Sequence, residues 1–119
     1  MNKMIKTLVP VAIVLGMLAS CAQPNLHPMD MTAAVQSAKT RADHEALAAH
    51  YEQAAQEAVS KIDEHKKLLE QYKTRGYLYG KQALNLQSHC EAIIRSYQQI
   101  ANANSEMAKT HRQLAESAN

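Results

Sequence analysis

The sequence predicts an all-α protein: a long antiparallel helical hairpin of coiled-coil type that dimerises into a four-helix bundle. Good helix formers, chiefly alanine, glutamine, glutamate, lysine and leucine, dominate residues 31–119. No proline occurs in that range, and phenylalanine and tryptophan are absent from the whole sequence. Apolar residues recur every seven positions, which is typical of packed helices and not of strands.

A short helix is expected at about 31–38 and a long one at about 41–75. Thr40 and Asp43 have the spacing of a capping box, in which the threonine hydroxyl accepts from the third backbone amide of the helix and the carboxylate accepts from the cap's own amide. The long helix is therefore predicted to start just after Thr40.

Two glycines frame the expected turn at 76–80. Gly76 stands where a helix-terminating glycine is favoured, and basic residues in the preceding turn suit the negative end of the helix dipole. A second long helix is expected at about 81–117. A lone hairpin of this size has little core, so we expect a second copy to cover its free flank.

Heptad rows predict which side chains lie between the two long helices. In the first helix the rows are His44, Tyr51, Ala58, His65 and Tyr72, together with Ala48, Ala55, Ile62 and Leu69. In the second they are Leu86, Ile93, Ile100, Met107 and Leu114, together with Cys90, Tyr97, Asn104 and His111. One row in each helix is unusually polar for a coiled coil.

Folding the second helix back on the first places His44 opposite His111 and His65 opposite Cys90, with His89 next to Cys90. The two layers are expected to lie about 30 Å apart along the helices. Imidazole and thiolate ligands suit zinc or copper. The alternative is a hydrogen-bonded polar seam that fixes helix register, with simple surface exposure as a third. Since no strong metal-binding motif is present, we expect no cofactor, with zinc or copper as the alternative.

Tyr72, Tyr77 and Tyr79 cluster at the turn, where they could form a protein contact patch or close the end of the bundle. Catalysis has no support in the sequence: no activated nucleophile, glycine-rich phosphate loop or paired carboxylates in a cleft are evident. We therefore do not expect an enzyme.

The N-terminus carries a targeting signal. Lys3 and Lys6 precede an apolar run at 8–17, which is too short to span a bilayer and has the length of a signal-peptide core. The run ends in Leu18-Ala19-Ser20-Cys21, which resembles the lipobox of bacterial lipoprotein precursors. The resemblance implies cleavage before Cys21 and acylation of its thiol and new amino group.

This resemblance divides the chain into a signal peptide at 1–20, a lipidated flexible tether at 21–30 and the hairpin at 31–119. The 13 basic residues outnumber the 11 acidic ones only through the two leader lysines, so the remainder is balanced. A balanced charge argues against nucleic-acid binding. The remaining cysteine, Cys90, cannot form an intramolecular disulfide.

Ala22 follows the lipobox cysteine, whereas lipoproteins kept in the inner membrane tend to have aspartate there. The resemblance thus implies the periplasmic face of the outer membrane, with the inner membrane as the alternative. The expected function is a structural or protein-interaction role in the cell envelope. The alternative function is periplasmic binding of zinc or copper by the inward-facing histidines and Cys90.

Overall fold

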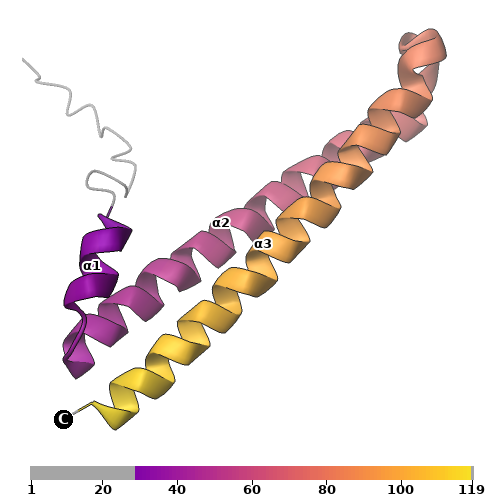
Figure 1. The fold of residues 1–119 in the computed structure, drawn as a ribbon. Coiled ribbons are helices and arrows are strands. Elements are labelled where there is room, and N and C mark those ends of the chain that lie inside the picture. Colours follow the sequence, from indigo (N-terminus) through magenta and orange to yellow (C-terminus); the bar gives the residue numbers. More distant parts are fainter. Residues whose placement is uncertain (1–28, 119) are drawn as a thin grey trace, which may run out of the picture.

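The structure is a computed structural model that describes residues 29–118. The helical elements of this part are α1 (Met31–Ser37), α2 (Arg41–Thr74), η1 (Gly76–Leu78), η2 (Gly80–Gln82) and α3 (Ala83–Ser117). No strand occurs among the described residues. α2 and α3 lie side by side and run in opposite directions, so the predicted antiparallel hairpin is confirmed (Figure 1). The predicted signal peptide, Cys21 and most of the predicted tether lie outside the described residues.

The start of α2 is fixed by the predicted capping box. The Asp43 amide donates to the Thr40 hydroxyl at 3.2 Å, and the Asp43 carboxylate accepts from the amides of Lys39 and Thr40 at 3.0 and 2.9 Å. These amide donors, Lys39 first and Thr40 next, lower the pKa of Asp43 to about 2. The carboxylate therefore stays charged, and the cap stays closed, at any pH well above that value.

The two 3-10 turns at the closed end form a compact connection. Backbone amides of Leu78, Tyr79 and Gln82 donate to carbonyls three residues earlier, at 2.9, 3.0 and 3.0 Å. Gly76 directly follows the cap of α2, as expected, but the residue with a left-handed backbone is Gly80, at φ 53°. A side chain at that position would be strained, because L-residues rarely adopt positive φ.

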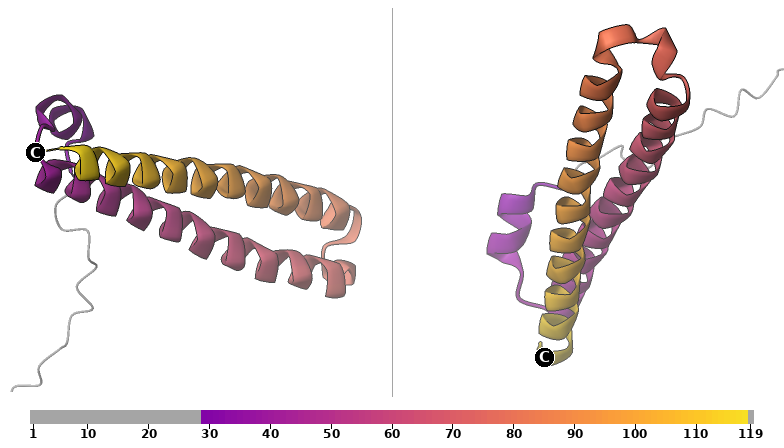
Figure 2. Two further views of the ribbon diagram at one scale, coloured as in Figure 1. Left: turned by 90° about the horizontal axis from the view of Figure 1, so that it is seen from below. Right: turned by 90° about the vertical axis from the view of Figure 1, so that its right-hand side faces the viewer.

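α1 folds back beside the start of α2, at the open end of the hairpin and near the end of α3 (Figure 2). The Asp30 carboxylate caps it by accepting from the amide of Ala33 at 3.1 Å. Leu47, at this end of α2, is only 1% exposed and has the most deeply buried large side chain among the described residues. The heptad rows did not predict this burial.

Small side chains dominate the contact between α2 and α3. The buried apolar residues along it are Ala48, Ala55, Ala58, Ile62, Cys90, Ile94, Ala101, Ala108 and Ala115. We call this set the alanine seam. The rows predicted for α2 do face the partner helix, since their members are buried or half-buried.

One predicted row of α3 is wrong beyond its first member, Leu86, which is half-buried. Ile93, Ile100, Met107 and Leu114, which we call the isoleucine row, keep 37, 45, 41 and 42% of their surface exposed. The row one position further along the chain, from Ile94 through Ala101 and Ala108 to Ala115, is buried instead. Besides the polar row of Cys90 and His111, which faces α2 as predicted, two neighbouring rows of α3 are apolar enough to face a partner. The one made mostly of alanine lets the two backbones approach closely, and α3 is rotated accordingly.

Removing the cap hydroxyl tests how firmly α2 begins. Thr40→Ala is expected to lower the free energy of unfolding by about 1 kcal/mol, because one amide at the helix start loses its acceptor. Urea denaturation followed by circular dichroism measures the change. Thr110→Ala is the control, since the Thr110 hydroxyl only returns to the Glu106 carbonyl within α3. Equal effects of the two substitutions would contradict the assigned role of Thr40.

Candidate functional site

The predicted layer at the open end of the hairpin is formed. Nδ1 of His44 and Nδ1 of His111 are 3.2 Å apart, while the ring centroids are 5.4 Å apart, so the two nitrogens lie between the rings. One nitrogen must carry a proton and donate it to the lone pair of the other. Tyr51 stacks on His111 from α2, at 5.6 Å between centroids and 8° between planes. The pair is thus an interhelical hydrogen bond held by an aromatic neighbour.

Burial lowers the pKa of His111 in this pair. His111 is 8% exposed, and burial, with a smaller contribution from His44, lowers its pKa below the ordinary value. If both facing nitrogens were protonated, two N–H groups would point at each other and the hydrogen bond would be lost. The pair therefore favours a state with a single proton between the helices.

The second predicted layer brings His65 and Cys90 into contact, whereas His89 only borders the same surface pocket as His65. The Cys90 thiol donates to the His65 carbonyl at 3.3 Å and lies 3.5 Å from His65 Nδ1. Burial, followed by the nearby Glu91, raises the pKa of this thiol, so it stays protonated. His89 is exposed. Tyr97 stacks on His65 at 6.2 Å, a contact that the opposed-residue pairing did not predict.

Each layer thus supplies two candidate ligands. No cluster of three or more histidine, cysteine, aspartate or glutamate side chains suited to a metal ion occurs in residues 29–118. In the layer at the open end the two Nδ1 atoms are hydrogen-bonded directly to each other, which leaves no space for an ion between them. Binding of zinc or copper stays a prediction from the sequence, and a four-coordinate ion would need further ligands from outside each pair.

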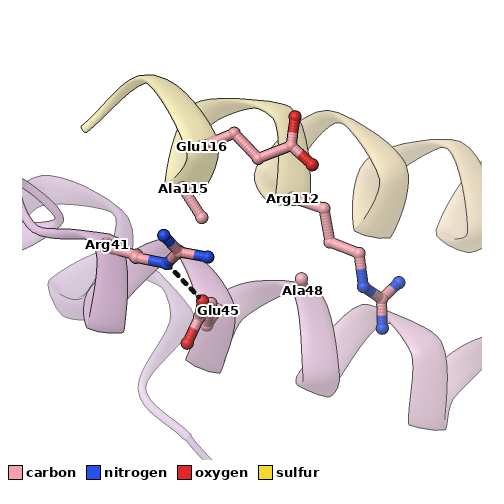
Figure 3. Close-up of a pocket in the computed structure, with 6 residues that line it drawn as sticks. All are labelled: Arg41, Glu45, Ala48, Arg112, Ala115 and Glu116. Atoms are coloured by element: carbon pink, nitrogen blue, oxygen red, sulfur yellow. Dashed lines mark hydrogen bonds and ion pairs between the residues drawn. The ribbon is translucent and has the colours of Figure 1, made fainter.

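A charged pocket of about 310 Å³ lies beside the open end of the seam (Figure 3). Ala48 and Ala115 form its base, where small side chains leave space between the helices. Arg41 pairs with Glu45 at 2.8 Å across its mouth. Arg112 extends from α3 toward α2 and pairs with Glu52 there. The two arginines of the pocket are thus paired with glutamates of the protein, so the pocket has little excess charge with which to bind an ionic ligand.

A shallow furrow runs along the opposite flank of the seam. Its middle section, about 690 Å³, includes Ala54 and Ala58 of α2 with Tyr97 and Ile100 of α3. The next section, about 570 Å³, shares Tyr97 and includes Ile93. Ile93 and Ile100 of the isoleucine row therefore border the furrow, and we call this side of the hairpin the apolar face.

The other side of the seam carries the Arg112–Glu52 ion pair. Helical spacing places Ile100 and Ser105 on opposite flanks of the seam. Ser105 borders a separate pocket with Glu52 and Val59, on the side of the Arg112–Glu52 ion pair. The apolar face is therefore apolar mainly along α3, since Glu57 and Lys61 of α2 border the same furrow.

The predicted tyrosine patch splits into two parts. Tyr72 is half-buried and packs edge-on against Tyr79, with 5.2 Å between the ring centroids. The backbone carbonyl of Tyr72 accepts a hydrogen bond from the side-chain amide of Gln87 at 3.1 Å. These two rings close the end of the hairpin. Tyr77, by contrast, is 80% exposed and points away from the core.

No family model, curated protein or solved structure matches this chain. Among the described residues, no helix combines the length and the apolar character needed to cross a membrane. The function must therefore be argued from the chain's own residues.

The histidine pair predicts a specific loss of stability in acid. Because the folded state lowers the pKa of His111, the unfolded chain binds more protons as pH falls below about 6.5, the ordinary histidine value. The stabilisation is complete above that pH and is lost on acidification. Urea unfolding at pH 8 and pH 5.5 measures the difference. His111→Gln is expected to reduce the pH dependence, whereas His89→Gln, on the exposed side of α3, should preserve it. An unchanged pH dependence in His111→Gln would contradict this account.

Proposed function

We propose that this protein is a lipid-anchored component of the bacterial cell envelope whose helical hairpin has a structural or interaction role and pairs with a second copy. The observation that carries the proposal is that the smaller apolar side chains are buried while larger ones are exposed. The seam buries mostly alanines, whereas isoleucine, methionine and leucine side chains line the outer, apolar face.

A second copy suits the apolar face better than water does. The isoleucine row repeats every seven residues along α3, the spacing at which helices pack against other helices. Scattered exposed apolar residues are ordinary, but a continuous row beside a furrow marks an interaction surface. A two-fold axis would place row against row and furrow against furrow, which gives a four-helix bundle with the flank of the Arg112–Glu52 ion pair outside.

The energetics favour the same arrangement. Covering the exposed part of one side chain of the isoleucine row is worth roughly 1–2 kcal/mol, and each copy contributes the four side chains of that row. The alanine seam alone removes much less apolar surface per residue. The pairing therefore adds the larger apolar side chains to the core that the isolated hairpin lacks.

The anchor in this proposal is Cys21. Its support is the lipobox-like Leu18-Ala19-Ser20-Cys21 that follows a basic and then apolar leader. Acyl chains contribute roughly 0.8 kcal/mol per buried CH₂, and two or more chains are needed for stable anchoring. A charge-balanced mature chain adds no general attraction to a membrane, so the lipid would hold the protein there. Ala22 favours the outer membrane, facing the periplasm.

Placing a charge on the apolar face tests self-association. Ile100→Glu is expected to weaken the dimer of residues 22–119 by about a hundredfold or more, since apolar burial is lost on both copies and a carboxylate is desolvated. Sedimentation equilibrium under reducing conditions measures the dissociation constant. Val59→Glu is the matched control, because Val59 is 48% exposed and lies on the flank of the Arg112–Glu52 ion pair. Monomers in the unaltered chain would refute the pairing.

Lipidation is tested with the two cysteines of the chain. In a two-membrane bacterium, Cys21→Ser is expected to abolish incorporation of labelled palmitate and to shift the protein out of the membrane fraction. Cys90→Ser should keep both the label and the fractionation. Label retained in Cys21→Ser, or absent from the unaltered chain, would exclude Cys21 as the anchor.

A further inference from the structure

The closed end of the hairpin carries a surface that the pairing of apolar faces does not use. We call residues 73–84 the turn tip. Its large apolar side chains project into solvent: Tyr77 is 80% exposed, Leu78 60% and Leu84 77%. Side chains this exposed contribute little to the core of the hairpin.

The turn tip is also cationic. Lys73, Arg75 and Lys81 are exposed, and the ion pairs found among the described residues do not involve them. No aspartate or glutamate occurs between Glu70 and Glu91. Elsewhere on the hairpin basic and acidic side chains are mixed, so the tip stands apart in its charge.

The tip holds these side chains in place. The turn is closed by three backbone hydrogen bonds, Tyr72 packs against Tyr79, and Gly80 supplies the left-handed residue that the connection needs. The exposed ring and leucines are therefore presented by an ordered turn. Binding through them costs less conformational entropy than binding through an unstructured loop.

From this combination we propose that the turn tip docks on the surface of an anionic lipid bilayer. Tyrosine suits the interface between headgroups and acyl chains, because its ring is apolar and its hydroxyl stays hydrated. Leu78 and Leu84 would enter the outer edge of the acyl region, and the three cations would lie at the level of the phosphates. A lysine or arginine near an anionic surface strengthens binding roughly fivefold, and salt screens the effect.

The proposed contact lies at the opposite end of the hairpin from α1, which begins at Met31 and follows the predicted tether. It is therefore separate from a lipid on Cys21. It also goes beyond the proposed pairing, since the isoleucine row does not include the turn tip. Failure of either proposal leaves the other standing.

Vesicle co-sedimentation of residues 22–119, which lack Cys21 and retain all described residues, tests the proposal. The probe is vesicles of phosphatidylcholine alone or mixed with phosphatidylglycerol. The expected result is at least tenfold tighter binding to the mixed vesicles, weakening as salt rises. Equal binding to both vesicle types, or no binding to either, would overturn the proposal.

Two double variants locate the binding surface. Arg75→Gln with Lys81→Gln is expected to weaken binding to the mixed vesicles by roughly 25-fold, and Tyr77→Ser with Leu78→Ser by tenfold or more. Lys66→Gln with Lys67→Gln removes the same charge from exposed positions of α2 outside the turn tip and should weaken binding by less than threefold. Circular dichroism verifies that each variant keeps its helix content. Comparable weakening by the control pair would mean that general charge, and not the tip, binds the vesicles.

Discussion

The close contact between the alanines of α2 and α3 is the constraint on which the rest of the structure depends. Alanine side chains let two helices approach closely, and the approach fixes how each helix is rotated about its axis. Once Ala101 and Ala108 face α2, the neighbouring Ile100 and Met107 must lie on the flank. The seam therefore creates the apolar face: the same rotation that packs small residues inside leaves the larger ones outside.

Much of this architecture can be predicted from the sequence because it depends on local chemistry and on period. Thr40 and Asp43 set the start of α2, and the turn between two glycines sets the pairing of His44 with His111 and of His65 with Cys90. These pairings follow from counting residues away from the turn. They need no knowledge of side-chain packing.

The rotation of α3 could not be predicted in the same way. Three neighbouring heptad rows of that helix are apolar or tolerate burial. Because all three repeat every seven residues, the repeat does not decide which two of them face α2. The choice depends on the helix–helix distance, a tertiary quantity. A signal was nevertheless present, since Ala101, Ala108 and Ala115 repeat at heptad spacing. The burial of Leu47 also depends on tertiary packing, which a heptad pattern does not include.

The two ends of the hairpin differ in chemistry. The open end has its polar groups satisfied internally, by the His44–His111 hydrogen bond and by ion pairs such as Arg112–Glu52. The closed end leaves its cations unpaired by acidic side chains and its leucines exposed. Polar groups that are paired within the protein suit a structural role. Unpaired charges and exposed apolar side chains suit contact with another surface. The apolar face, which extends along α3, also suits contact with another surface.

The most direct test of the central claim, that a second copy covers the apolar face, is the dependence of the thermal unfolding midpoint on protein concentration. For residues 22–119 under reducing conditions, the account predicts a midpoint that rises by several degrees over a hundredfold increase in concentration, because unfolding is then coupled to dissociation. A midpoint independent of concentration, in a chain shown to be monomeric by its mass, would contradict the account. The apolar face would then be uncovered in the isolated protein.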